Sequence, residues 1–237
     1  MNDATYIGNE LELFEKAVNW KRYYASFLKP YLKGRVVEVG AGLGGTTSSL
    51  CDGSQEEWLC LEPDAVLAAH VSEKIAAKAL PTCCRVHVGF LSELPEDHKY
   101  DVAIYIDVLE HIEHDSAQLE EVTRYLKPGG HVIVLSPAYQ WLFSPFDAAI
   151  GHYRRYTRPM LLAAAPPTLR RVKAFYLDSL GLCTSAANKL FLKQSQPTPE
   201  QIKLWDSVIV PISKVTDALI GYNAGRSVIA VWQYNGK

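Results

Sequence analysis

The sequence predicts an α/β fold in which a mostly parallel sheet is covered by helices on both faces. Short apolar segments alternate with amphipathic ones over 35–136, the order that produces parallel strands joined by helices. The first apolar segment runs directly into a glycine-rich loop, Gly40-Ala41-Gly42-Leu43-Gly44-Gly45. The chain has 237 residues, 48% of them hydrophobic, which is enough to bury the core of one such domain.

The expected elements follow from the spacing of apolar residues and from the residues that interrupt it. A helix is predicted over 11–32, where apolar positions recur at helical spacing until Pro30 and Gly34 end it. Apolar runs of strand length predict strands at 35–39, 58–61, 86–88, 100–106 and 131–135. The helices predicted between them begin at Thr46 and span 64–80 and 115–126.

The last third of the chain has a less regular pattern. Residues 136–156 are predicted to form a long aromatic-rich loop, and 194–200, with two prolines, a linker or lid. Helices are predicted over 159–165 and over 202–220, the second bent near Pro211, and strands over 169–177 and 227–232. No internal repeat interrupts this order, so we expect a single domain over 1–237.

The composition argues against several classes of partner and location. A formal net charge of -2 offers no basic face, so nucleic acid is not an expected partner. The first residues lack a signal-peptide pattern, and no apolar run reaches the roughly 18 residues of a membrane span. The five cysteines show no CxxC spacing, which favours reduced thiols over disulfides or a zinc site. A cytoplasmic protein is therefore expected.

Two apolar segments leave alternatives open. Trp20, Tyr23 and Tyr24 can cover a ligand or simply pack in the core, since their spacing is helical. The helix over 202–220 can close a pocket, support a homodimer or rest on a membrane surface. Its charges are few and mixed, so membrane contact ranks last, and a monomer or homodimer is expected.

The glycine loop has the composition of a binding site for an adenosine cofactor. Glycines let the chain turn tightly and let a ligand lie against bare backbone, and the helix that follows directs N–H groups at the ligand. Glu62 stands 22 positions beyond Gly40, at the end of the next strand, where its carboxylate can bind both ribose hydroxyls. Because Gly40, Gly42 and Gly45 satisfy GxGxxG, the loop alone fits NAD and S-adenosylmethionine equally well.

Glu38 favours S-adenosylmethionine over NAD. It lies inside an apolar strand, two residues before the first glycine of the loop. A buried carboxylate costs several kcal/mol unless it is paired, and a ligand with a sulfonium and an ammonium group would supply the pairing charge. The alternative is that Glu38 pairs with a lysine or accepts hydrogen bonds from backbone N–H groups.

Four segments within 36–136 resemble the motifs of the class I S-adenosylmethionine-dependent methyltransferases. They are 37–44 with the glycine loop, Leu61-Glu62-Pro63-Asp64, 100–112, and Leu126-Lys127-Pro128-Gly129-Gly130. The resemblance implies a Rossmann-like, seven-stranded sheet with an antiparallel last strand. It also implies a helical lid over 1–34, a cofactor-binding core over 35–136 and an acceptor side over 137–237.

The resemblance implies that S-adenosyl-L-methionine is the cofactor. The residues assigned to it are Glu38, Gly40, Ala41, Gly42, Gly44, Glu62, Pro63, Phe90, Leu91, Asp107 and Val108. One position departs from the family pattern, because Phe90 stands where an Asp commonly bonds the adenine amino group. Phe90 can instead stack on adenine, or the backbone N–H of Leu91 can read its edge.

His111 and His152 are the candidate general bases on the acceptor side. Methyl transfer needs alignment of the acceptor and exclusion of water, and only sometimes the removal of a proton. Imidazole has a pKa suited to that removal, but either ring can instead pack in a loop or touch the cofactor. His111 and His114 have HxxH spacing without further carboxylates in register, so no metal site is expected.

Residues 146–157 resemble a Gly-His-x-Arg-Arg-Tyr stretch found in one subgroup of these enzymes. The expected substrate-binding residues are Trp141, Phe146, Tyr153, Arg154, Arg155 and Tyr156. Guanidinium groups bind carboxylate or phosphate and stack on aromatic rings, so an aromatic or anionic small molecule is favoured. The alternative is a structural clasp in which one arginine pairs with Asp147.

The sequence therefore predicts a methyltransferase that acts on an oxygen or nitrogen atom of a small molecule. A non-catalytic cofactor-binding protein is a second reading, because the glycines and Glu62 report binding and not turnover. An NAD-dependent reductase is a third, weakened by Glu38 and by the lack of a convincing Tyr-x-x-x-Lys pair.

Overall fold

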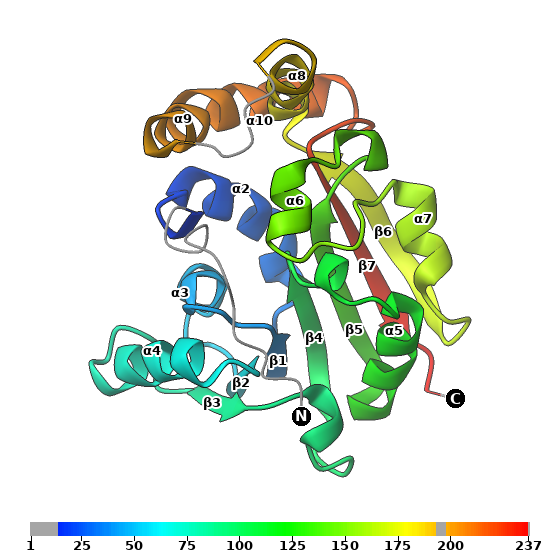
Figure 1. The fold of residues 1–237 in the computed structure, drawn as a ribbon. Coiled ribbons are helices and arrows are strands. Elements are labelled where there is room, and N and C mark those ends of the chain that lie inside the picture. The colour runs from blue at the N-terminus through cyan, green and yellow to red at the C-terminus, as the bar shows by residue number, and fades with distance from the viewer. Residues whose placement is uncertain (1–13, 193–197, 237) are drawn as a thin grey trace.

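The structure is a computed structural model that describes residues 14–192 and 198–236, and within them it forms one seven-stranded sheet (Figure 1). The strands are β1 (Arg35–Val39), β2 (Glu57–Glu62), β3 (Cys84–Val88), β4 (Tyr100–Ile106), β5 (Leu126–Pro137), β6 (Leu169–Leu177) and β7 (Ser227–Tyr234). Their order is β3-β2-β1-β4-β5-β7-β6, and β7 pairs antiparallel with both β5 and β6. The predicted fold class is confirmed.

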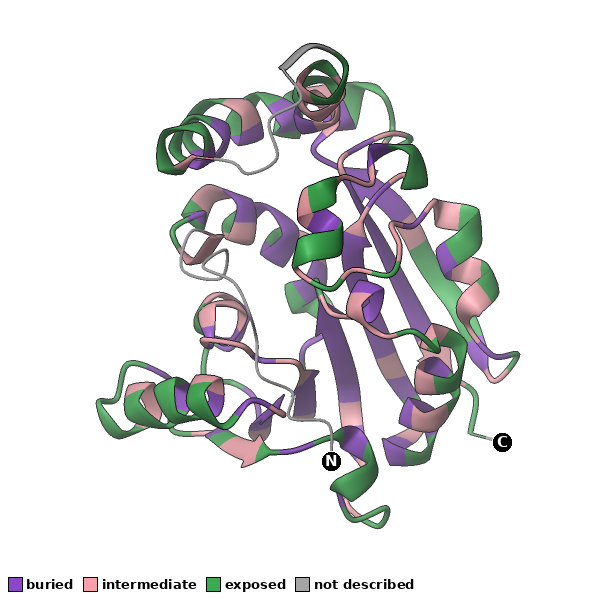
Figure 2. Ribbon diagram, in the orientation of Figure 1, coloured by how far each residue is buried: buried purple, intermediate pink, exposed green. Residues whose placement is uncertain are grey.

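Helices cover both faces of this sheet. They are α2 (Val18–Leu28), α3 (Gly45–Leu50), α4 (Ala65–Ala76), α5 (Asp115–Val122), α6 (Pro145–Ala149), α7 (Arg158–Ala164), α8 (Ser179–Ala187), α9 (Pro199–Leu204) and α10 (Val210–Leu219). Side chains of β4 alternate between the two faces. Val102 and Ile104 join the core under α2, α3 and α4, whereas Ala103 and Tyr105 join the core under α5 and α7. Figure 2 shows the central strands buried and the outer sides of α4 and α9 exposed.

Most predicted elements are present, with shifted ends. The helix predicted over 11–32 is broken by a turn at Lys16, so that α2 begins only at Val18; residues 11–13 lie outside the described part. β5 already begins at Leu126, so the predicted Pro128-Gly129-Gly130 turn lies inside the strand as an irregularity. A Cβ at Gly130 would lie 2.9 Å from the Lys127 carbonyl oxygen, which explains the glycine there.

Helical segments that the pattern did not predict lie in the last third. α6 forms inside the predicted aromatic loop, and the capping box of Ser144 and Asp147 with Pro145 at its start accounts for it. α8 and its π-helical continuation Asn188–Leu192 were also not predicted. The predicted bend near Pro211 is a π-helical turn, Trp205–Ile209, between α9 and α10.

Buried carboxylates join the helices of the last third, α8 to α10, to the rest of the domain. Asp206 accepts hydrogen bonds from the backbone N–H groups of Asn19 and Trp20, the first turn of α2. Asp217 accepts bonds from the Tyr23 hydroxyl at 2.8 Å and from the backbone N–H of Asp178 at 2.7 Å. These acceptors satisfy helix-end N–H groups that have no partner within their own helices. No helix in the described ranges is long and apolar enough to cross a membrane.

Replacing Asp217 with alanine is expected to destabilise the fold by about 3 kcal/mol, because buried donors lose a charged acceptor. Chemical denaturation of the variant and the wild type measures this difference. Asp97→Ala, at an exposed position, is the matched control and should change the free energy of unfolding by less than about 0.5 kcal/mol. Equal losses in both variants would contradict the role given to Asp217.

Candidate functional site

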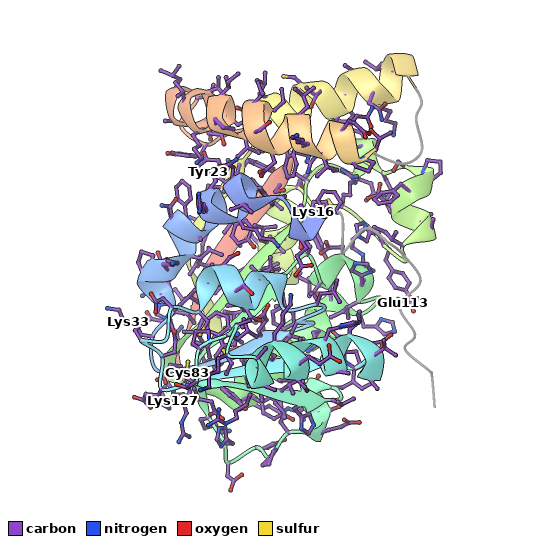
Figure 3. All side chains as sticks on the ribbon, turned by 90° about the vertical axis from the view of Figure 1, so that its left-hand side faces the viewer. Lys16, Tyr23, Lys33, Cys83, Glu113 and Lys127 are labelled. Atoms are coloured by element: carbon purple, nitrogen blue, oxygen red, sulfur yellow. The ribbon has the colours of Figure 1, made fainter. Side chains whose placement is uncertain are left out.

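A cavity of about 1230 Å³ opens where the parallel strands end. Its wall contains the glycine loop, the turn after β2, the segment after β4, parts of 137–155, and residues of α8 and α9. Figure 3 shows Lys33, Cys83 and Lys127, which lie at the amino ends of strands, on the opposite side of the molecule from Glu113, which follows β4. The cavity therefore lies where ligands commonly bind in parallel α/β sheets.

The glycine loop is held open by backbone hydrogen bonds to β2. The N–H groups of Gly40 and Ala41 both donate to the carbonyl of Leu61. Gly40 and Gly42 have φ of 71° and 53°, a conformation that favours glycine. A Cβ at Gly40 would lie 2.7 Å from the Val108 side chain, so the loop and the segment after β4 pack without space for one. Gly40, Ala41 and Gly42 line the cavity, whereas Gly44 caps α3 beside it.

Glu62 is fixed at the cavity wall by two backbone donors. Its Oε2 accepts from the N–H of Gly42 at 2.8 Å, and its Oε1 accepts from the N–H of Asp64 at 3.0 Å. Burial raises the pKa of Glu62, and these two hydrogen bonds oppose that rise. Each carboxylate oxygen retains a lone pair for a ligand hydroxyl, as the ribose assignment requires. Pro63 lines the cavity next to it.

Glu38 is satisfied by partners that sequence reasoning missed. Its Oε2 accepts from the Thr47 hydroxyl at 2.6 Å and from the Trp58 indole N–H at 2.7 Å. Burial raises the pKa of Glu38 to about 7, although these two hydrogen bonds lower it. These donors are a hydroxyl and an indole, not a lysine or backbone N–H groups, and Glu38 does not itself line the cavity. The sequence did hint at Thr47 as a partner, because it is the third residue of α3, the helix that follows β1 and the glycine loop.

The structure separates the remaining assigned cofactor residues into two groups. Asp107 and Val108, directly after β4, line the cavity. Asp107 has a φ of 54° and is exposed to the cavity, although the surrounding protein raises its pKa to about 6. Phe90 is exposed and Leu91 is buried, and neither lines the cavity. Adenine recognition by Phe90 or Leu91 therefore stays a prediction.

The two candidate bases lie together. The rings of His111 and His152 meet edge to face with centroids 4.5 Å apart, and both line the cavity. Burial, reinforced by His152, lowers the pKa of His111 to about 4, so this ring is neutral at pH 7. Nδ1 of His152 lies 2.9 Å from Asp147 Oδ1, and its Nε2 lies 4.0 Å from Oε1 of the buried Glu110. An Nδ1–H bonded to Asp147 leaves Nε2 of His152 as a proton acceptor.

The adjacent arginines both take part in clasps. Arg155 binds Asp147 through Nε at 2.9 Å and Nη2 at 3.0 Å. Burial alone would raise the pKa of Asp147, but hydrogen bonds from His152 and Arg155 hold it below its usual range. Arg154 lies 2.8 Å from Asp115 and does not line the cavity, whereas Arg155 does. The predicted pair with Asp147 is thus formed by Arg155, which also faces the cavity, whereas Arg154 pairs with a different carboxylate.

Some of the aromatic residues assigned to the acceptor line the cavity and others do not. Phe146 and Tyr153 line the cavity. Trp141 is 51% exposed and lies outside it. Tyr156 is 1% exposed, and its hydroxyl donates to Asp115 at 2.7 Å. The assignments of Trp141 and Tyr156 to substrate contact are therefore not supported by their positions, because Tyr156 is enclosed by the clasp that it helps to form.

Some cavity residues could not be found from the sequence. Arg226, at the start of β7, lies with its guanidinium 4.2 Å over the Trp205 ring and its Nε 3.6 Å from Asp178. Trp205 and Arg226 both line the cavity, as does Lys21 of α2. Burial lowers the pKa of Lys21, while Glu15 opposes that effect. No local pattern marks these residues, because tertiary packing alone brings them to one wall.

Two groups of potential metal ligands occur in the described part of the chain. One consists of Glu110, His111 and His152 in the cavity wall, and the other of Cys51, Cys83 and Cys84 beneath α4. The cysteines are free thiols, and burial contributes to the raised pKa of Cys83. His114, the other half of the HxxH pair, is exposed and belongs to neither group.

Comparisons with known proteins agree with this geometry. A family model described as a methyltransferase domain matches residues 37–132. The sterol 4-C-methyltransferase strm-1 of Caenorhabditis elegans is 30% identical over 100 residues, 41% of this chain and 29% of that protein. The chain spans 18% to 36% of the lengths of the curated relatives that it matches.

Solved structures share the fold. A geranyl diphosphate methyltransferase in complex with SAM is 14% identical with a TM-score of 0.63, covering 98% of this chain and 93% of that one. The [4+2]-cyclase SpnF is 15% identical with a TM-score of 0.62, covering 91% of this chain and 82% of that one. Residues 37–132 thus match a methyltransferase domain, set within the seven-stranded Rossmann-like fold of methyltransferases.

Proposed function

We propose that this chain is an S-adenosylmethionine-dependent methyltransferase that acts on a small molecule. The observation that carries the proposal is one continuous cavity of about 1230 Å³ that reaches from the glycine loop and Glu62 to the two histidines. Ligand pockets usually measure roughly 300–1,000 Å³, so this cavity has space for a cofactor and an acceptor together. When bound, S-adenosylmethionine supplies a methyl group on a sulfonium, which a nucleophile takes by in-line displacement.

The cofactor half of the cavity fits this molecule. Gly40 and Gly42 present backbone without side chains, and Glu62 presents two oriented carboxylate oxygens to a ribose. Asp107, facing the cavity after β4, adds a negative charge for a cationic ligand. Glu38 accepts a hydrogen bond from Thr47, in the helix that follows the glycine loop, and does not bind the ligand itself. The solved neighbour in complex with SAM shares the fold, which supports the choice of cofactor.

The acceptor half combines apolar rings with a few polar groups. Phe146, Tyr153 and Trp205 offer surface for a ring or an alkyl chain, and Arg155 and Arg226 offer positive charge for an anionic group. Nε2 of His152, held by Asp147 on the other side of the ring, is placed to accept a proton from an acceptor hydroxyl or amine. We infer a single cytoplasmic domain, monomeric or homodimeric, with no nucleic-acid partner.

A second function is supported by one observation. The [4+2]-cyclase SpnF has this fold, so the fold does not by itself require methyl transfer. The chain could thus bind the cofactor for stability without transferring its methyl group. Release of S-adenosylhomocysteine on incubation with pools of hydroxy and amino compounds decides between the two. Release above the acceptor-free rate supports the enzyme, and its absence across the pools supports binding alone.

Calorimetry tests the cofactor directly. S-adenosylmethionine and S-adenosylhomocysteine are expected to bind, and NAD is not. Glu62→Ala should weaken S-adenosylmethionine binding by about 1–3 kcal/mol, the scale for losing a charged hydrogen-bond partner. Glu73→Ala, exposed on α4, is the control that should leave the affinity unchanged. Binding of NAD alone would contradict the proposal.

A further inference from the structure

Glu110 is a buried carboxylate with one unsatisfied oxygen. The residue is 0% exposed, and its Oε2 accepts from the Ser136 hydroxyl at 2.9 Å. Its Oε1 has no hydrogen-bond partner among the described residues. Burial and the nearby Asp107 raise the pKa of Glu110 well above its usual value. Leaving such an oxygen without a donor or a cation costs free energy, so its retention in a cavity wall indicates a missing partner.

Two imidazole rings face that oxygen. One ligand atom each of Glu110, His111 and His152 lies within 4.8 Å of the others, and His152 Nε2 is 4.0 Å from Glu110 Oε1. Ligand atoms on one metal lie roughly 3–3.5 Å apart when each bond is about 2.1 Å long. Side-chain movements of about 1 Å would therefore bring the three ligand atoms within bonding distance of one metal ion.

The surrounding residues orient both rings as metal-bound histidines are oriented. Asp147 Oδ1 lies 2.9 Å from Nδ1 of His152, and Asp147 is itself held by Arg155 and Ser144. The ring of His111 has a hydrogen bond with the backbone of Ile150. A partner on Nδ1 of His152 directs its Nε2 toward Glu110, as such partners direct the ligating nitrogen of metal-bound histidines.

A divalent ion would supply the partner that Glu110 Oε1 lacks. Asp107 lies near Glu110, and so does the guanidinium group of Arg155, which is bound to Asp147.

We propose that Glu110, His111 and His152 bind one divalent first-row transition metal ion in the cavity wall. Two imidazoles and one carboxylate leave coordination positions open, and all three residues line the cavity, so those positions face the acceptor. This departs from the sequence-based expectation of no metal. The metal site itself does not depend on the proposed function. One consequence does rest on it: in a methyltransferase, this site would favour a hydroxyl compound as the acceptor. With such an ion bound, an acceptor hydroxyl on it would have a lowered pKa and would release its proton to solvent, and His152 would be a ligand instead of a base.

The thiols of Cys51, Cys83 and Cys84 are a competing site for soft metals, because three of them lie together. Mn²⁺ separates the two sites, since it prefers oxygen and nitrogen ligands. The experiment is a titration of the chelator-treated full chain with MnCl₂, followed by the electron paramagnetic resonance signal of free Mn²⁺. S-adenosylmethionine is omitted, so failure of the methyltransferase assignment does not affect the result.

The expected result is saturable binding of one Mn²⁺ per chain. Glu110→Gln and His152→Gln should each weaken binding at least tenfold, whereas His114→Gln, at an exposed histidine outside the cluster, should bind as the wild type does. The wild-type protein provides a readout that needs no variant. Of its seven histidines, the ring signals of His111 and His152 should broaden first in proton NMR spectra as Mn²⁺ is added.

Three outcomes would overturn the proposal. The first is no saturable binding below about 1 mM Mn²⁺, an affinity of about -4 kcal/mol. The second is unchanged binding in both folded variants, with folding checked by circular dichroism. The third is broadening of other histidines ahead of His111 and His152.

Discussion

Gly42→Val is expected to abolish S-adenosylmethionine binding, with a loss of more than about 100-fold, or 3 kcal/mol, in affinity. Gly42 lines the cavity with φ of 53°, so a valine would project its side chain into the space assigned to the ligand. A β-branched residue also resists this backbone conformation, which would pull the N–H of Gly42 away from Glu62. Calorimetry with S-adenosylmethionine measures the loss.

The control for backbone strain is Gly53→Val. Gly53 has φ of 86°, and a Cβ there would make only ordinary contact, 3.5 Å from Pro81. It lies outside the cavity wall, so this variant should lose stability but retain the wild-type affinity. Thermal melting of both apo variants shows whether either one unfolds. Wild-type affinity in a folded Gly42→Val protein would mean that the cofactor site lies elsewhere.

His152→Ala is expected to lower turnover by about 10²–10⁴-fold while cofactor affinity stays the same. His152 is held by Asp147 with Nε2 toward the cavity and Glu110, so its loss removes either the proton acceptor or a metal ligand. The measurement pairs release of S-adenosylhomocysteine, with an acceptor found by screening, with calorimetry of S-adenosylmethionine. His114→Ala is the matched control outside the cluster.

The pH dependence of turnover tests whether His111 acts as the base. The pKa of His111 is lowered to about 4, so this ring is neutral from pH 7 down to about pH 5. A fall in turnover between these values therefore reports another group. Full activity in both His111→Ala and His152→Ala would leave alignment of the reactants as the whole mechanism.

Local pattern was a sound guide for several strands of the fold. The strands predicted at 100–106 and 169–177 have the bounds of β4, in the centre of the sheet, and of β6, at its edge. α8 was missed, because its residues 179–187 are mostly small, mix serine and threonine with apolar residues, and show no helical periodicity. The start of α8 depends on Asp217, whose carboxylate accepts a hydrogen bond from the backbone N–H of Asp178. These two residues are 39 positions apart in the sequence.

The candidate site likewise contains residues that local pattern could identify and contacts that it could not. Gly40, Gly42 and Glu62 could be assigned from spacing alone, because a turn after one strand and a carboxylate after the next meet at the same sheet edge. Glu38 was noticed for the right reason, a carboxylate in an apolar strand, but its partners Thr47 and Trp58 come from two other elements. No spacing rule connects them.

The sequence by itself determined the order of the strands and the place of the glycine loop, since both depend on residues close together in the chain. Only the tertiary structure decided which polar groups share the cavity. It brought Glu110 from the end of β4 to His152 from a loop 42 positions later, and placed Arg226 over Trp205. Burial then changed their chemistry, raising the pKa of Glu110 and lowering that of His111, because solvent is excluded only once the chain has folded.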